Sequence, residues 1–311
     1  MDLAELRARL DRVDADLIGL AAERQRIVSE IGRYKRAQGR QVRDFARERD
    51  VLERAARNAA QVGLDPRLAQ DLLRQLIEAS LATQETERVR ALGGGAGRRA
   101  LVIGGGGRMG RWFAQFLDAQ GYGITVADPA GTPDDFPCVP DWRALDLDHD
   151  LVVVAAPLRI SADVLLELAA RRPSGVVFDL GSLKSPLAAG LGALREAGVR
   201  VASVHPMFGP SVNVLAGRHV VFVDCGVPEA TAIARALFEE TMAIPVEMSL
   251  AEHDRVMGYV LGLSHALNIT FFTALADSHE QAARLAEVSS TTFDRQLAIA
   301  RGVAGENPHL Y

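Results

Sequence analysis

Three glycines and one aspartate in the middle of the chain have the types and spacing of a nucleotide-binding turn. Gly105, Gly107 and Gly110 give the pattern G-x-G-x-x-G, directly after a short apolar run at residues 100–103 and before a stretch with helical periodicity. Glycines there let the backbone turn tightly and approach a pyrophosphate at the N-terminus of the helix. Asp128 follows the next apolar run, where a carboxylate can bind a ribose 2′-hydroxyl and would repel a 2′-phosphate. The pattern therefore favours an NAD site.

A second group of polar residues interrupts an apolar pattern near the N-terminus. A three-four alternation of apolar residues predicts one long helix over residues 2–37. Arg24 lies on this apolar seam, and Lys35 lies about three turns further along the same face. A buried arginine is costly without an anion, so the seam favours a site for an anionic ligand. Lys35 and Lys184 are the only lysines, which indicates places where the planar arginine fork does not fit.

Two further helices are expected before residue 90. Asp44 is a candidate N-cap for a helix that ends near Gly63, and Asp65 precedes a proline at the first turn of the third helix. Ser80 and Gln84 continue the inward apolar stripe of that third helix. Polar groups are again placed where a core is expected.

These positions resemble the all-helical chorismate mutase family over nearly all of residues 1–90. The matching active-site positions are Arg7, Arg24, Lys35, Asp44, Arg47, Glu48, Ser80 and Gln84. The resemblance implies that the three arginines bind the carboxylates of chorismate and that Lys35 and Gln84 meet its ether oxygen. It also implies that Asp44 and Glu48 orient the ring hydroxyl. Because the rearrangement to prephenate is pericyclic, positioning and electrostatics carry the catalysis.

The rest of the chain has an α/β pattern. A glycine linker, residues 91–98, precedes alternating strands and helices, which predict a doubly wound parallel sheet. The strands are expected at residues 100–103, 123–127, 151–155, 175–178 and 199–204. Pro157 follows a strand end where a nicotinamide ring could lie. The cofactor candidates on the sheet are Gly105, Gly107, Arg108, Met109, Gly110, Asp128 and Pro157.

Two motifs after strand ends, Asp-Leu-Gly-Ser-Leu-Lys at 179–184 and His-Pro-Met-Phe-Gly-Pro at 205–210, resemble prephenate dehydrogenase. Fusion to a chorismate mutase is known in that family. The resemblance implies NAD-dependent oxidative decarboxylation of prephenate to 4-hydroxyphenylpyruvate. It implies that neutral His205 accepts the proton of the substrate's 4-hydroxyl. It also implies that Ser182 orients His205 and contacts the nicotinamide.

A long helix is expected to begin near Ala251, and the resemblance extends into it. His265 and Asn268, three residues apart on one face, match positions that line the family's substrate pocket. His253, near the start of the helix, is interpreted as a surface or interface residue.

The chain departs from that family near its C-terminus. The family carries an arginine for the substrate's side-chain carboxylate about six residues before a closing motif, which here is residues 306–308, and Gly302 occupies that position. We expect Arg301 or Arg295 to bind this carboxylate, or prephenate to be a poor substrate.

The prephenate dehydrogenase family usually continues through further helices of its dimer core. This chain stops at Tyr311, so we expect a shortened domain or a homodimer that depends more on the mutase half. The chorismate mutase family pairs its long helices between two chains, with the Arg7 position serving the partner's site.

Composition agrees with a soluble enzyme in the cytoplasm. The net charge is −5 without a basic tract, so nucleic acid is not an expected partner. No uninterrupted apolar run approaches 18 residues, so no membrane span is expected. The acidic N-terminus lacks a signal-peptide pattern. Cys138 and Cys225 suggest neither a disulfide framework nor a metal site.

The expected architecture is therefore multidomain. It comprises an all-α three-helix domain at 1–90, the linker at 91–98, an NAD-binding Rossmann-type domain at 99–250 and a short all-α segment at 251–311. Two alternatives to the hydroxy-substrate reading stay open. One is the same two steps on the 4-amino-4-deoxy analogues of chorismate and prephenate. The other is an active mutase with a non-catalytic, regulatory NAD-binding module.

Overall fold

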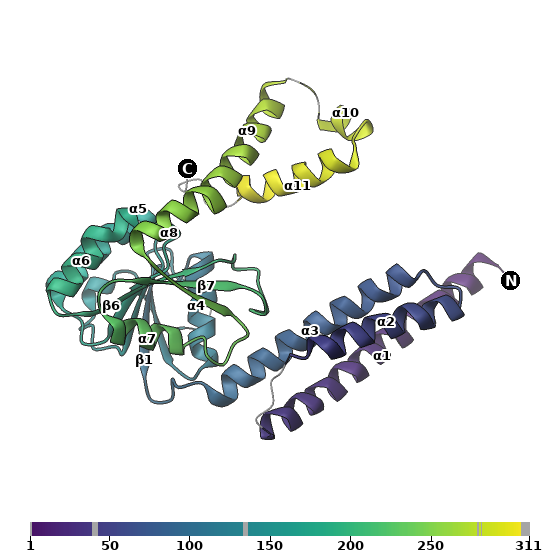
Figure 1. Cartoon of the computed structure of the whole chain (residues 1–311), viewed down its shortest axis with the longest axis horizontal. Helices are drawn as coiled ribbons and strands as arrows, with labels where there is room; N and C mark the ends of the chain where they lie inside the picture. The colour runs from purple at the N-terminus through teal and green to yellow at the C-terminus, as the bar shows by residue number, and fades with distance from the viewer. Residues whose placement is uncertain (1, 39–42, 133–135, 279, 281, 306–311) are drawn as a thin grey trace. The chain divides into compact units, whose positions relative to one another are not determined.

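The computed structural model describes residues 2–38, 43–132, 136–278, 280 and 282–305 (Figure 1). Its contacts divide the chain into two compact units. The first unit is Met1–Gly94 with two later segments, Ser211–Arg218 and Phe238–Ile244. The second unit holds the remainder of the chain. Each unit is described by itself.

Three helices form the body of the first unit: α1 (Leu3–Ala37), α2 (Phe45–Gln61) and α3 (Pro66–Leu92). The predicted caps are present, because Asp44 accepts a hydrogen bond from Arg47 N and Asp65 accepts one from Arg67 N. Asp2 caps α1 in the same way, through Glu5 N. A carboxylate at these places satisfies one of the backbone N–H groups that a helix start leaves without a partner.

The apolar seam of α1 is exposed in the single chain. Each of its apolar residues is at least 47% exposed, and Gly32 is the buried residue of this helix. The exposed seam residues are Leu3, Leu6, Leu10, Val13, Leu17, Leu20, Ile27 and Ile31. A helix with such a stripe is stabilised by packing against another apolar surface, and the described residues of this unit do not supply one.

Glu85 on α3 holds the two later segments of the first unit. Its carboxylate accepts hydrogen bonds from Leu215 N and Met242 N, each at 2.6 Å. Burial raises the pKa of Glu85, and the two backbone N–H groups partly offset this. One turn later, Arg88 Nε donates to Glu240 Oε2 at 2.6 Å.

One sheet organises the second unit. Its strands are β1 (Arg99–Ile103), β2 (Gly123–Ala127), β3 (Cys138–Val139), β4 (Leu151–Val154), β5 (Val176–Asp179), β6 (Arg200–Pro206), β7 (His219–Asp224) and β8 (Ile244–Ser249). Their order is β3-β2-β1-β4-β5-β6-β7-β8. The pairs from β3 to β6 are parallel, as predicted, whereas β7 runs antiparallel to β6. The two-residue strand β3 follows a segment rich in proline, glycine and aspartate, a composition typical of a loop.

Helices cover both faces of this sheet. They are α4 (Arg108–Ala119), α5 (Leu158–Arg171), α6 (Ala188–Glu196) and α7 (Pro228–Ala236), with short 3-10 turns η1 (Trp142–Ala144) and η2 (Ser185–Leu187). α5 and α6 pack on one face, where Leu165 and Leu194 join a buried core with Val177. Phe178, the next residue of β5, points to the other face and packs edge-on against Phe113 of α4. This alternation is what a sheet buried on both sides requires.

The C-terminal part is helical but interrupted. α8 (Leu250–Met257) is followed by a π-helical turn, η3 (Gly258–Leu263), and by α9 (Ser264–Asp277), where the sequence predicts one helix. After α10 (Ala282–Glu287), α11 (Thr291–Gly305) packs on α9 through the hydrogen bond from Gln296 Nε2 to Asn268 Oδ1 at 2.7 Å. By length and composition, Leu250–Asp277 is the one described helical run that could cross a membrane. An interface helix has the same composition, so the expectation of no membrane partner stays a prediction.

Candidate active sites

The first candidate site centres on a hydrogen-bonded cluster between α1 and α3. Arg24 Nη1 donates to Ser80 Oγ at 3.1 Å and to the carbonyl of Leu76 at 3.2 Å. The Ser80 hydroxyl bonds Gln25 Oε1 at 2.6 Å. Arg24 is half-buried against α3, and burial lowers its pKa, whereas the apolar residues of the seam are exposed. The structure therefore brings two of the predicted residues together.

Gln84 lies against α1 at a glycine. Its Nε2 donates to the carbonyl of Val28 at 3.0 Å, and the side chain is buried. A Cβ atom added at Gly32 would lie 3.0 Å from Gln84 Cγ, so the glycine leaves room for the amide. The place of Gln84 thus depends on both helices.

The other predicted mutase residues have different surroundings. The Asp44 side chain caps the N-terminus of α2. Arg47 forms an ion pair with Asp50 at 2.7 Å, and Glu48 forms one with Arg43 at 3.0 Å. Lys35 is half-buried and Arg7 is exposed. No hydrogen bond recorded among the described residues joins Arg7, Asp44, Arg47 or Glu48 to Arg24, Ser80 or Gln84. Their roles stay predictions.

In the second unit, the glycine turn has the shape that a dinucleotide needs. A Cβ atom at Gly105 would lie 2.7 Å from Val126 Cγ1, and one at Gly110 would meet the carbonyl of Gly104. Gly107 is the N-cap of α4 and makes no side-chain cap, so the N-terminus of this helix is left to a ligand. Arg108 and Met109 form its first turn.

Asp128 lies beside this turn, as predicted. Its carboxylate accepts hydrogen bonds from Gly106 N at 3.1 Å and from Ala130 N at 2.9 Å. A Cβ atom at Gly106 would lie 2.8 Å from Asp128 Cγ. The tight turn, the open helix N-terminus and the adjacent carboxylate fit NAD.

His205 lies within β6 rather than after it. The sequence ends this strand at Val204, but pairing of His205 with Val221 and of Pro206 with Val220 on antiparallel β7 extends it. The histidine is 5% exposed. Burial lowers its pKa well below the ordinary value, Lys184 and His253 lower it further, and Asp254 acts in the opposite direction. The imidazole is therefore neutral near pH 7, as a proton acceptor must be.

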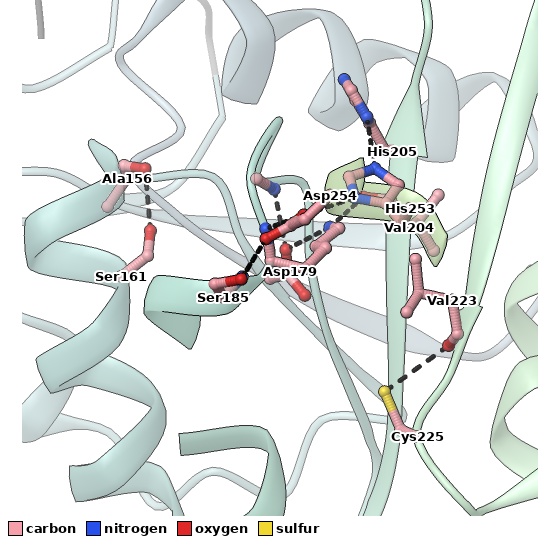
Figure 2. Close-up of polar contacts among 12 residues, drawn as sticks. Ala156, Ser161, Asp179, Ser185, Val204, His205, Val223, Cys225, His253 and Asp254 are labelled. Atoms are coloured by element: carbon pink, nitrogen blue, oxygen red, sulfur yellow. Dashed lines mark hydrogen bonds and ion pairs between the residues drawn. The ribbon is translucent and has the colours of Figure 1, made fainter. Parts of the chain in front are cut away.

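A buried network surrounds His205 (Figure 2). Its Nδ1 lies 2.9 Å from His253 Nε2, and His253 Nδ1 lies 2.7 Å from Asp254 Oδ1. Asp254 also accepts hydrogen bonds from Lys184 N at 2.9 Å and Ser185 N at 2.6 Å. The interpretation of His253 as a surface residue is wrong, because this side chain has no solvent exposure.

The remaining predicted residues of this unit are placed as follows. Ser182 is half-buried, and no hydrogen bond to His205 is recorded for it among the described residues; His253 makes that contact instead. Pro157 caps α5. Asn268 is buried and His265 is half-buried on α9. Arg295 and Arg301 are exposed on α11, and the closing motif at 306–308 lies outside the described residues.

Two family models match the two parts of the chain. The one described as "Chorismate mutase type II" matches residues 6–85, and "Prephenate dehydrogenase, nucleotide-binding domain" matches residues 135–244. The chain is 29% identical over its whole length to the T-protein of Enterobacter agglomerans, of which it covers 80%. The chain belongs to the bifunctional chorismate mutase–prephenate dehydrogenase family. The first unit thus contains the mutase helices, and the second contains the dehydrogenase sheet.

Other relatives match the dehydrogenase part. A 4-amino-4-deoxyprephenate dehydrogenase of Streptomyces pristinaespiralis is 31% identical, over 70% of this chain and 77% of its own length. A solved prephenate dehydrogenase from A. aeolicus, in complex with hydroxyphenyl propionate and NAD+, has a TM-score of 0.51 at 21% identity. It covers 68% of this chain and 79% of its own, and supports the fold.

Sequence reasoning missed the partners of His205. His253 and Met257 are four residues apart and both buried, so they share the inward face of α8. The spacing could have indicated that His253 points inward. The acidic residue directly after it gave a further signal, because a buried histidine needs hydrogen-bond partners.

Proposed function

We propose that this protein converts chorismate to prephenate and then oxidatively decarboxylates prephenate to 4-hydroxyphenylpyruvate with NAD. The observation that carries the proposal is the neutral, buried His205, on a sheet whose glycine turn fits NAD. The same chain carries the mutase cluster, and its similarity to T-proteins extends over its whole length. One chain thus holds candidates for two consecutive reactions.

In the mutase step, the protein binds and orients a dianion. Arg24 is held by Ser80 and by a backbone carbonyl, so its remaining N–H groups have a fixed direction toward a carboxylate. Lys35 and Gln84 stabilise the negative charge that develops on the ether oxygen. No proton transfer is needed, so fixed donors in the correct place are sufficient.

In the dehydrogenase step, His205 accepts the proton of the substrate's 4-hydroxyl. NAD, when bound at Gly105, Gly107, Gly110 and Asp128, supplies the hydride acceptor. Ser182 and Pro157 border the nicotinamide end of that site, and His265 and Asn268 line the substrate side. The low pKa of His205 keeps it unprotonated and ready to accept a proton at neutral pH.

The protein acts as a homodimer in the cytoplasm under this proposal. The exposed seam of α1 is the surface that a second copy would cover, and Arg7 on that helix would serve the partner's site. The run Leu250–Asp277 adds exposed apolar side chains, among them Tyr259, Leu263 and Leu267. Both cysteines are free, which suits a reducing compartment.

The experiment supplies purified protein with chorismate and NAD+ and follows both chorismate loss and NADH. The proposal expects both signals, and expects His205→Asn to abolish NADH while chorismate is still consumed. NADH from 4-amino-4-deoxychorismate but not from chorismate would instead assign the amino series. Chorismate loss without NADH from either compound would indicate a mutase with a regulatory NAD-binding module.

A further inference from the structure

His253 and Asp254 lie outside both predicted motifs, yet they contact the base. Asp254 accepts hydrogen bonds from the backbone N–H groups of Lys184 and Ser185 and from the Ser185 hydroxyl. Burial raises the pKa of Asp254, but these hydrogen bonds outweigh it and lower the pKa to about 2. The carboxylate is therefore ionised and can only accept. It follows that His253 Nδ1 carries a proton and donates a hydrogen bond to the Asp254 carboxylate.

The protonation of His253 Nδ1 determines the tautomer of His205. A neutral imidazole has one N–H and one lone pair, so the lone pair of His253 lies on Nε2. That atom is 2.9 Å from His205 Nδ1, so His205 Nδ1 must be the donor. The lone pair of His205 is then on Nε2, the ring atom outside this chain of hydrogen bonds.

We propose that His253 and Asp254 are positioning residues that hold His205 with Nε2 as the base and accept its charge after proton transfer. The inference deepens the proposed dehydrogenase function and rests on it. When the substrate hydroxyl proton binds His205 Nε2, the Nδ1 proton of His205 passes to His253 Nε2. His205 ends neutral with its proton on Nε2, and His253 ends as an imidazolium paired with Asp254. One proton enters the chain and none is lost.

The charges around the two rings support this direction of transfer. Burial lowers the pKa of both histidines, and the Lys184 ammonium from the β5–η2 loop lowers it further, although that ammonium is itself paired with Asp179 of β5 at 2.6 Å. For His253 alone, the hydrogen bond to Asp254 acts in the opposite direction. Asp254 of α8 is hydrogen-bonded to His253 at 2.7 Å, whereas it reaches His205 only through that ring. A positive charge is therefore better compensated on His253 than on His205.

Variants separate orientation from proton transfer. His253→Ala removes the acceptor, and we expect kcat with prephenate to fall by about 100-fold or more while KM stays within about 3-fold. His253→Gln restores an oxygen that accepts the His205 N–H but cannot take its proton, so it should recover only part of the loss. His219→Gln, an exposed histidine on β7, is the matched control and should match the wild type. NAD+ titration of each variant verifies that the sheet is intact.

Asp254→Asn tests the charge. Loss of the anion lowers the pKa of His205 further, so the acidic limb of the kcat–pH profile should move to lower pH. A merely structural defect would lower the amplitude and leave the limb in place. Wild-type kcat in His253→Ala, or an unmoved limb in Asp254→Asn, would overturn the proposal.

A measurement without turnover distinguishes this proposal from the proposed function. Imidazole ¹⁵N NMR of the full chain should show His205 protonated on Nδ1 in the wild type, and should show that preference lost in His253→Ala. The proposal fails if wild-type His205 carries its proton on Nε2. If the tautomer is as stated but prephenate gives no NADH, the proposed function fails while the hydrogen-bond chain stands.

Discussion

Lys184 Nζ lies 2.6 Å from Asp179 Oδ1, and neither side chain is exposed to solvent. The ammonium also donates to the carbonyl of Val204 at 3.0 Å, one residue before His205. The pair thus links Asp179, the last residue of β5, to the β6 residue that directly precedes the base. A compact ammonium fits this enclosed place, which accounts for one of the two lysines in a chain whose other basic side chains are arginines.

Lys184→Met should destabilise the dehydrogenase unit by about 3–5 kcal/mol, because it leaves the Asp179 carboxylate buried without its partner. Urea unfolding followed by circular dichroism measures the change. The double variant Lys184→Met/Asp179→Leu removes both charges and should recover much of the loss. An equal loss in the double variant would mean that packing, rather than the unpaired charge, is responsible.

Gly32→Ala should lower mutase kcat/KM by about 10-fold or more, since the new Cβ displaces Gln84 and small displacements at a catalytic group are costly. Gly19→Ala is the matched control on the same helix, because a Cβ there meets nothing within 4 Å. It should keep full activity. Equal rates in both variants would show that Gln84 tolerates the shift or takes no part in the reaction.

Lys35→Ala should reduce the mutase rate by about 100-fold or more, as expected when one preorganised donor to a developing anion is removed. Chorismate loss gives the rate, and circular dichroism checks that the helices persist. Arg33→Ala removes an exposed cation from the same helix and should change the rate little. Unchanged turnover in Lys35→Ala would remove this lysine from the site.

Asp128→Ala should narrow the preference for NAD+ over NADP+, because the carboxylate both binds a ribose hydroxyl and repels a 2′-phosphate. The kcat/KM ratio for the two cofactors is the measurement. Asp118→Ala makes the same charge change at an exposed position of α4 and should leave the ratio as in the wild type. Comparable use of both cofactors by the wild type would contradict the assignment.

Either Arg295→Ala or Arg301→Ala should lower kcat/KM for prephenate by about 10- to 150-fold. This fold-change corresponds to the loss of one charge-assisted arginine–carboxylate contact, which is worth roughly 1.5–3 kcal/mol. A large loss in one variant identifies the arginine that replaces the family's residue at Gly302. Efficient wild-type turnover with no loss in either would assign the carboxylate to another group.

Local patterns in the sequence were sufficient for most of the fold. The glycine turn between β1 and α4, the caps Asp44 and Asp65, and the parallel strands all follow from short-range rules on turns, caps and periodicity. The position of Arg24 on an apolar seam predicted a site for an anionic ligand; the structure places Arg24 beside Ser80, and the ligand stays a prediction.

The tertiary structure decided which distant residues are in contact. His253 follows His205 by 48 residues, and their contact depends on how α8 packs against the end of β6. The extension of β6 through His205 required pairing with an antiparallel neighbour, and the Glu85 carboxylate found its partners at Leu215 and Met242, more than a hundred residues away. The sequence by itself determined which residues could do chemistry and which elements carry them. The partners of those residues were decided by long-range packing, because hydrogen bonds between distant segments leave no periodic signal in either segment alone.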